Sequence, residues 1–437
     1  MNKPLNAVDA FLGAMRDNTK GVASGIYSVC SAHPLVIDAA ITRAVQDSSI
    51  LCIESTSNQV DQFGGYTGLT PAAFAAWIYT LAAAKGLGRE WILLGGDHLG
   101  PNAWRSKPAE EAMILAEELV RQYVSAGYLK IHLDCSMPLG GDSVTAGEPL
   151  PDTLVAQRAA RLCRIAEAAA KHNPQPPIYI IGTEVPVPGG ATHHEDHIPC
   201  TTVAAANATI TTTREIFAKE GVGHAWSRVV GAVVQPGVEF GDDFVFDFKA
   251  DKARDLSQSI LKHPGMVFEA HSTDYQTVDN LTALVSGHFA ILKVGPWLTF
   301  AMREGIFALL GIESALAASG RIAAPSQLAS VIDEVMAKNP KWWKSYYLTD
   351  VEFKKRYSFS DRIRYYWGDP AITAALDKLF ANLDQAGIPE SLLGQFFPDA
   401  FAAVRAHQLP ARARDLVRFR IDTVLRAYAK ACGQLKN

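Results

Sequence analysis

The chain has 437 residues, with 41 Lys and Arg against 45 Asp and Glu for a formal net charge of −4, and 48% of its residues are hydrophobic. This composition excludes a chain that is disordered throughout, because enough apolar surface is present to offset the entropy lost on ordering. The lack of a basic excess or a basic run argues against nucleic-acid binding. The length predicts two or three domains, unless one α/β barrel of about 250 residues accounts for most of it.

The cysteines and the apolar segments indicate the compartment. Six cysteines are scattered without a CxxC pair or a repeated spacing, which indicates reduced thiols and not a disulfide framework or a zinc ribbon. No window reaches about 18 uninterrupted apolar residues, so no membrane span is predicted. Residues 1–21 predict a short amphipathic helix and lack the features of a signal peptide. We therefore expect a cytoplasmic protein.

Short apolar, β-branched runs alternate eight times with helical patterns. Nearly continuous apolar runs are typical of parallel strands buried on both faces. The expected strands cover 25–30, 49–54, 91–95, 129–134, 177–182, 228–234, 265–270 and 289–294. The expected helices cover 34–45, a segment opening at Thr70 and Pro71, 108–126, 151–172, 212–220, 251–263, 275–286 and 299–310.

Eight such repeats predict an α/β protein built on a (β/α)8 TIM barrel over residues 22–311. A doubly wound open sheet is the alternative, but no GxGxxG follows an early strand and no GxxxxGK[ST] occurs. We divide the chain into a barrel with its N-terminal helix at 1–311 and a helical C-terminal extension at 312–437. The helices expected in the extension cover 325–338, 370–387, 397–407 and 410–433. Its aromatic-rich connectors at 341–347 and 364–370 fit a subunit interface and ordinary core packing equally well.

Polar side chains concentrate where the expected strands end, which is where barrel enzymes carry their active sites. The candidate ring comprises His33, Glu54, Asp97, His98, His132, Asp134, Glu184, Glu239 and His271. Histidines and carboxylates that converge in this way suit a divalent metal, such as zinc or manganese, with open coordination positions. Such a metal would polarise a carbonyl or enediolate oxygen, and Asp97 could move a proton.

Each of these residues also has a purely structural interpretation, since a lone polar residue at a strand end more often caps a helix. Function is favoured for Asp97 and His98, because two glycines precede them and a charged pair at a strand end is costly unless it is used. Function is favoured for His271 as well. Glu239 is balanced between the two interpretations, and His132 is equally well a core histidine. The His-rich loop at 192–200 is better explained as a solvated lid than as a metal site.

Five segments look familiar as a set. They are ESTSNQVDQFGGYTG at 54–68, GGDHLGPN at 95–102, TEVPVPGG at 183–190, FEAHSTDYQ at 268–276 and KVGPWLTF at 293–300. Together they resemble the GatZ/KbaZ family, the larger subunit of D-tagatose-1,6-bisphosphate aldolase, and the resemblance runs through essentially the whole chain. It implies a barrel related to the metal-dependent class II aldolases.

The resemblance also implies residue roles. Asp97 matches the proton-transfer residue of the class II enzymes. The implied metal ligands are His98, Glu239, which stands in place of a histidine, and His271. The implied further catalytic carboxylates are Asp134 and Glu184, and the implied substrate-binding residues are Ser136, Glu54, Asn58 and Gln59. The cofactor expected is a divalent metal.

Two loops depart from the class II pattern. Those enzymes follow the strand-seven histidine with Gly-Ala-Ser-Gly, whereas this chain has STDY at 272–275. They follow strand eight with Asn-Val-Ala-Thr, whereas this chain has GPWL at 295–298. Backbone amides and small residues in these loops cradle phosphate. The departures therefore put bisphosphate binding in doubt.

Two functions remain open from the sequence. The chain is either a companion that supports a separate class II catalytic subunit of the GatY/KbaY type, or a metal-dependent aldolase or ketose C4 epimerase in its own right. The expected partners are a ketose or ketose phosphate, the aldolase subunit and a second copy of the chain, without nucleic acid or membrane. Some relatives carry the label tagatose-6-phosphate kinase, but nothing in the sequence supports an ATP site.

Overall fold

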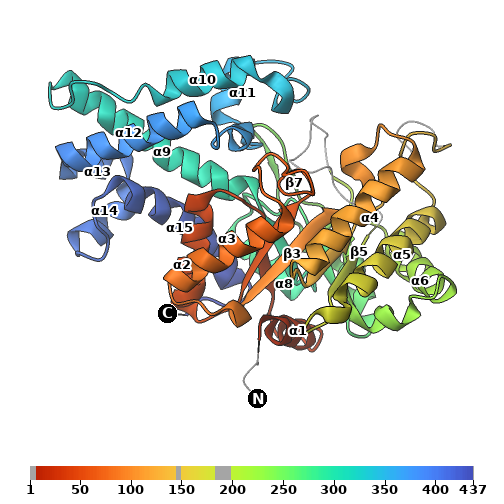
Figure 1. Ribbon diagram of the computed structural model, residues 1–437. Coiled ribbons are helices and arrows are strands. Elements are labelled where there is room, and N and C mark those ends of the chain that lie inside the picture. The colour runs from red at the N-terminus through yellow and green to blue at the C-terminus, as the bar shows by residue number, and fades with distance from the viewer. Residues whose placement is uncertain (1–5, 144–148, 183–197, 437) are drawn as a thin grey trace.

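A closed barrel of eight parallel strands forms the centre of the molecule. The computed structural model describes residues 6–143, 149–182 and 198–436. The strands follow one another around the barrel in chain order (Figure 1). They are β1 (Ile26–Val29), β2 (Leu51–Thr56), β3 (Ile92–Leu99), β4 (Lys130–Leu133), β5 (Ile178–Ile181), β6 (Val229–Val234), β9 (Val267–Ala270) and β10 (Ile291–Val294). All eight predicted strands, and with them the TIM-barrel prediction, are confirmed.

Seven helices link these strands and cover the outside of the barrel. They are α2 (Pro34–Asp47), α3 (Pro71–Ala84), α4 (Ala109–Ser125), α5 (Asp152–Ala169), α6 (Val203–Lys219), α7 (Ala250–Ser259) and α8 (Val278–Ser286). Helix α6 begins earlier than the expected start at 212, because the side chain of Thr202 accepts the Ala205 amide and caps the helix there. The small and β-branched residues of its first turns weaken the amphipathic pattern, so the sequence alone did not reveal them.

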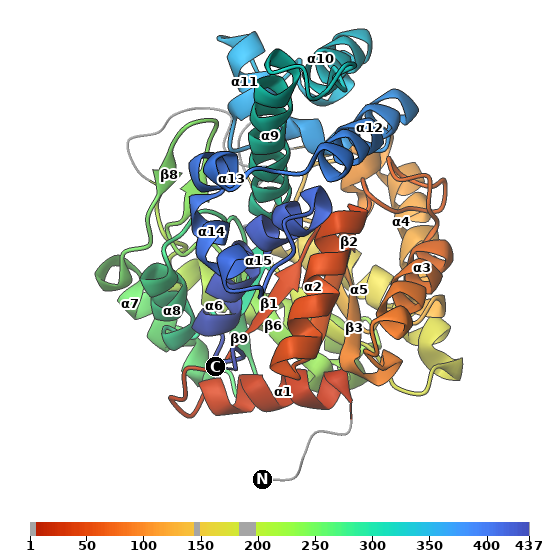
Figure 2. The same ribbon diagram turned by 90° about the vertical axis from the view of Figure 1, so that its left-hand side faces the viewer.

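The N-terminal helix closes one end of the barrel. Helix α1 (Ala7–Asn18) lies across the end at which the strands begin (Figure 2). Its Phe11 and Met15 are buried in one apolar cluster with residues from the strand starts, including Ile26, Ile178 and Ile291. This end of the barrel is therefore filled by side chains, and polar chemistry is left to the other end.

The chain after β10 forms helices that leave the barrel and then return to it. They are α9 (Pro296–Ala318), α10 (Leu328–Lys338), α11 (Val351–Tyr357), α12 (Pro370–Ala386), α13 (Glu390–Phe396), α14 (Pro398–Arg405) and α15 (Ala413–Ala431). Helix α9 runs without a break across the expected domain boundary at 311–312. Helix α15 packs against α2, α8 and α9 (Figure 2), so the last helix of the chain fills the outer ring between the first and the seventh barrel helices.

Specific contacts bind this C-terminal extension to the barrel. The hydroxyl of Tyr428 on α15 donates to the carbonyl of Thr273, and the Thr273 hydroxyl donates to the carbonyl of Lys293 at 2.6 Å. The short helix η7 (Arg362–Tyr365) brings Tyr365 against Tyr66 from the loop after β2, with ring centroids 5.1 Å apart. The extension therefore contacts the loops at the carboxyl ends of the strands.

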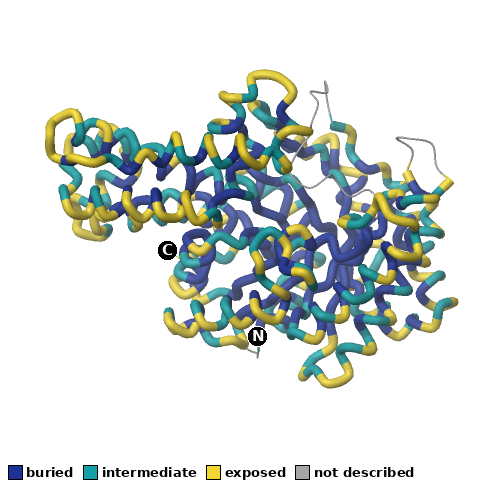
Figure 3. Tube along the Cα trace, turned by 45° about the horizontal axis from the view of Figure 1, so that its top comes forward, coloured by how far each residue is buried: buried dark blue, intermediate teal, exposed yellow. Residues whose placement is uncertain are grey.

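Burial follows this architecture. The barrel strands are buried, whereas the outer sides of the helices are exposed (Figure 3). The hairpin of β7 (Glu239–Phe240) and β8 (Val245–Phe246), and helices α11 and α13, were not predicted, because each is too short to show a period in the sequence. No helix in the described ranges has the length and apolar character needed to cross a membrane.

Candidate active site

A network of buried charges fills the interior of the barrel below its open end. Lys130 on β4 lies 2.5 Å from Glu54 on β2 and 2.6 Å from Glu269 on β9, and all three side chains are fully buried. Lys293 on β10 forms ion pairs with Glu54 and, at 3.0 Å, with Asp97. Although burial opposes charge on Lys130, the two glutamates outweigh it and raise the pKa of the ammonium group above its ordinary value. Each charge thus depends on partners from other strands.

Asp97 connects this network to the open end of the barrel. It lies at the end of β3, where one carboxylate oxygen contacts Lys293 and the other lies 3.1 Å from Nδ1 of His132. Burial alone would raise the pKa of Asp97, but the charges of His98 and Lys293 and the hydrogen bond from His132 hold it well below the ordinary value. Asp97 is therefore an ionised carboxylate at neutral pH.

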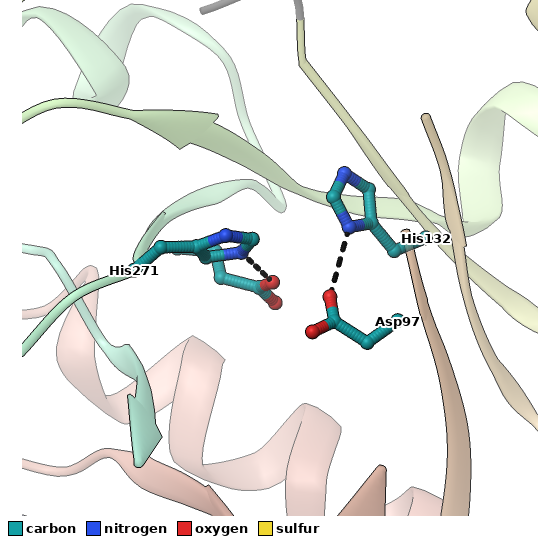
Figure 4. Close-up of side chains that lie close together, drawn as sticks. Asp97, His132 and His271 are labelled. Atoms are coloured by element: carbon teal, nitrogen blue, oxygen red, sulfur yellow. Dashed lines mark hydrogen bonds and ion pairs between the residues drawn. The ribbon is translucent and has the colours of Figure 1, made fainter. Parts of the chain in front are cut away.

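Three imidazoles gather around Asp97. The ring centroids of His98, His132 and His271 lie 4.9 to 5.5 Å from one another. Nδ1 of His98 lies 2.8 Å from a carboxylate oxygen of Asp134, and Nε2 of His271 lies 2.8 Å from Glu269. Figure 4 shows the Asp97 carboxylate facing the ring of His132, to which a dashed line joins it, with the ring of His271 nearby. Each imidazole thus has one nitrogen against a carboxylate, as metal-ligating histidines usually do.

This histidine cluster has the properties of a divalent-metal site. Asp97, His132, Glu269 and His271 each offer one ligand atom, and these four atoms lie within 4.8 Å of one another. Nε2 of His132 is buried and makes no hydrogen bond to any described residue, and such an orphaned atom calls for a missing partner. Burial lowers the pKa of His271 to about 4, which leaves its ring neutral and able to donate a lone pair. Nitrogen and carboxylate donors of this kind fit zinc or manganese.

A pocket opens onto this cluster from the carboxyl ends of the strands. Asn58 and Gln59, which were predicted to bind substrate, line it together with Asp97, His98 and His271. The pocket is also lined by Tyr66, Asp274, Lys293, Arg364 and Tyr365. Glu54 lies deeper, inside the charge network. The predicted substrate residues from 54–59 are thus split between the pocket wall and the layer beneath it.

Asp134 and Ser136 lie beside the histidines and not on the pocket wall. The Ser136 hydroxyl donates to Asp134 at 2.7 Å, and its backbone amide donates to the same oxygen at 3.1 Å. The other oxygen of Asp134 faces His98. This pair therefore sets the orientation of the His98 ring.

Other residues of the predicted ring are outside the group of four converging ligand atoms. Glu239 is buried in the β7–β8 hairpin, where it accepts the Phe240 amide at 3.0 Å and where burial raises its pKa to about 7. Of the three metal ligands that the resemblance implies, only His271 is among the four residues whose ligand atoms converge, and His98 and Glu239 are not. His33 accepts the Leu35 amide and caps α2. Glu184 and most of the loop at 192–200 fall outside the described residues.

Three charged residues of this region had no role predicted from the sequence, namely Lys130, Glu269 and Lys293. A signal for the first two was present, since Lys130 and Glu269 stand two positions before His132 and His271, and residues two apart share one face of a strand. A lysine inside an apolar strand was the signal for Lys293. No such signal marked Arg364, which reaches the pocket from the extension.

Asp274 holds the start of α9 from the loop after β9. One of its carboxylate oxygens accepts the amide of Gly295 at 3.0 Å and the amide of Trp297 at 2.8 Å. The side chain is buried, and burial raises its pKa from 3.8 to about 6 in spite of these two bonds. The carboxylate therefore binds the amino end of α9, but keeping this buried group ionised costs free energy.

The fold and this site define the class of protein as a TIM barrel with a polar pocket at the carboxyl ends of its strands, the place where barrel enzymes carry their active sites. The model of the family named D-tagatose-1,6-bisphosphate aldolase subunit GatZ/KbaZ-like matches residues 12–433. The chain therefore belongs to this family, and the resemblance seen in the sequence is confirmed.

Two solved structures are similar to this chain to different degrees. The chain is 45% identical to a probable tagatose 6 phosphate kinase from Sinorhizobium meliloti 1021, covering 93% of this chain and 100% of that one with a TM-score of 0.85. The likeness to a fructose-bisphosphate aldolase from Campylobacter jejuni is much weaker, at 13% identity and a TM-score of 0.44 over 87% of this chain and 95% of that one.

The charge network makes a prediction about stability. Lys130→Met should lower the free energy of unfolding by about 3–5 kcal/mol, because it removes the lysine that pairs with the buried Glu269 and leaves Glu54 with Lys293 alone. Urea denaturation measures the change. Lys338→Met is the matched control: Lys338 is 78% exposed and 3.9 Å from Glu334, so its loss should cost less than about 1 kcal/mol. Equal losses in the two variants would contradict the ion network.

Asp274 makes a prediction about pH. Because its pKa in the folded protein lies above its ordinary value, the folded state holds the extra proton between about pH 4 and pH 6, and stability falls as pH rises through that window. Asp274→Asn keeps an acceptor oxygen and removes the titration. Relative to the unmodified protein, the variant should gain stability as pH rises, by up to about 3 kcal/mol at pH 7. Parallel stability profiles of the two proteins in urea would disprove this assignment.

Proposed function

We propose that this chain is a tagatose-bisphosphate aldolase subunit whose own barrel carries a metal-dependent site for a ketose or ketose phosphate. The family supplies the reaction class. The observation that carries the proposal is the histidine cluster around Asp97, at the bottom of a pocket lined by polar residues. A purely structural companion has no evident need for three buried imidazoles that are each paired with a carboxylate.

In this proposal Asp97 moves the proton. Aldol cleavage of a ketose takes a proton from the hydroxyl on C4 and breaks the C3–C4 bond, which leaves an enediolate and an aldehyde. A C4 epimerase would re-form the same bond on the other face of the aldehyde. Asp97 is ionised and lines the pocket, so it is in the state and place needed to accept this proton. Lys293 and His132 hold its two oxygens and keep it oriented.

His98 and His271 hold the divalent metal in this proposal, and a third ligand comes from His132 or from Glu239. The orphaned Nε2 of His132 favours the first choice, whereas the resemblance to class II aldolases favours the second. When bound, such a metal polarises the carbonyl of the ketose. Asp134 and Glu269 orient the imidazoles from behind.

The same family membership supports a second function, in which the chain acts as a companion to a separate class II catalytic subunit. The family is described as a subunit, which implies a partner chain. The name of the Sinorhizobium meliloti protein suggests a kinase instead. We consider a kinase activity less well supported than the other two functions, because the sequence has no GxxxxGK[ST] motif to bind nucleotide phosphates.

Metal content tests the site directly. The purified protein should contain about one zinc or manganese ion per chain by mass spectrometry of the metal, and His271→Ala should lose it. His132→Ala and Glu239→Gln then identify the third ligand, since only the variant that lacks a ligand releases the ion. His407→Ala, at an exposed position, should retain it. An unmodified protein without metal, or a His271→Ala variant that keeps it, would rule out this site.

Aldolase assays on mixtures separate the two functions. If the barrel is active itself, Asp97→Asn should lower cleavage or epimerisation about 10²- to 10⁴-fold, as expected for loss of a general base. If the chain is only a companion, Asp97→Asn should stimulate a small class II aldolase subunit as well as the unmodified chain does. Gel filtration of the mixture shows whether a complex forms. Both functions would be refuted if the chain by itself is inactive, does not stimulate the aldolase subunit and forms no complex with it.

A further inference from the structure

The usual phosphate site of a TIM barrel is already occupied by the chain itself. In such barrels phosphate binds to the loops after strands seven and eight and to the amino end of a helix. Here those loops follow β9 and β10, and the backbone amides of Gly295 and Trp297, at the amino end of α9, are bonded to the carboxylate of Asp274. A phosphate placed there would have to displace a buried carboxylate and would be repelled by it.

The cations of the pocket are not equivalent. Lys293 is neutralised by Glu54 and Asp97, so its charge belongs to the interior network. Arg364, from η7, is held by neutral acceptors: its guanidinium donates to the hydroxyl of Tyr365 at 3.0 Å and to backbone carbonyls at the start of the same segment. Among the described residues no carboxylate lies within ion-pair distance of Arg364. This positive charge is fixed in place without a direct ion pair, and the Asp361 and Asp274 carboxylates act on it only from beyond ion-pair distance.

Arg364 shares its pocket with the proposed catalytic groups. Arg364 and Tyr365 line the same pocket as Asp97, His98 and His271. Tyr66 packs its ring edge-on against Tyr365, so the wall that carries Arg364 is braced by the loop after β2. One molecule in the pocket can therefore contact the histidine cluster with one end and the guanidinium with the other. A guanidinium is well suited to bind phosphate oxygens through two parallel hydrogen bonds.

We propose that Arg364 binds the single phosphate group of a ketose monophosphate, and that Asp274 excludes a second phosphate from the usual barrel site. This inference rests on the proposed function, because it places the sugar end of the ligand at the histidine cluster. It assigns to the C-terminal extension the anion recognition that the barrel loops provide elsewhere. It also makes the ligand of this chain's own pocket a monophosphate, in preference to a free sugar or to the bisphosphate that the family's name carries.

Calorimetric binding to the full-length purified protein tests this inference without any need for turnover. The probes are a ketohexose, its 6-phosphate, its 1,6-bisphosphate and inorganic phosphate. Arg364→Gln should weaken binding of the monophosphate about tenfold or more and leave the free sugar unchanged, because only a charge-assisted contact is lost. Arg364→Lys should lose less, since it keeps the charge. Arg414→Gln, at a residue paired with Asp377 on the surface, should bind all four probes as the unmodified protein does.

Two results would overturn the inference. One is a monophosphate affinity that is the same in Arg364→Gln, Arg364→Lys and the unmodified protein. The other is a bisphosphate that binds more than about tenfold tighter than the monophosphate, because that gain requires a second phosphate site. Melting temperatures confirm that the variants are folded. If monophosphate binding depends on Arg364 but the protein has neither metal nor aldolase activity, the proposed function is refuted and the phosphate site is retained. If the protein contains metal and has aldolase activity but its affinity for the monophosphate does not depend on Arg364, the phosphate site is refuted and the proposed function is retained.

Discussion

The charge network inside the barrel is the constraint on which the rest of the site depends. Lys130, Lys293, Glu54, Glu269 and Asp97 come from five different strands, and each would be too costly to bury without the others. Closing the barrel in its observed order is what brings them together, because partners such as β4 and β9 are not adjacent in the sheet. Strand order and site geometry are therefore coupled through these ion pairs.

The histidine cluster is the upper layer of the same arrangement. Side chains two positions apart on a strand point to the same side, so Lys130 on β4 is followed by His132, and Glu269 on β9 is followed by His271. Glu269 belongs to both layers, since it contacts Lys130 below and the imidazole of His271 above. Removing a charge from the lower layer would thus disturb the orientation of the histidines as well as stability.

Much of the fold and part of the site could be predicted from the sequence, because eight apolar runs and the polar residues that end them are local patterns. Asp97, His98 and His271 do meet, as expected. Glu239 could not be placed, because its position is set by a two-residue hairpin strand that leaves no periodic signal. Arg364 could not be found either, because a segment far along the chain folds back over the barrel only when α9 and α15 pack together.

The C-terminal extension has a physical reason to contact the pocket. Since Asp274 accepts the amides of Gly295 and Trp297 at the start of α9, these two backbone donors are not free for an anionic ligand. Thr273, the residue before it, is bound by Tyr428 of α15, so the loop that blocks the barrel site is also the loop that anchors the extension. The extension also brings η7 to the pocket, where Arg364 and Tyr365 are among the lining residues. The loop after β9 thus both occupies the usual anion site and anchors the extension, and the extension in turn supplies the guanidinium that we propose as the anion site.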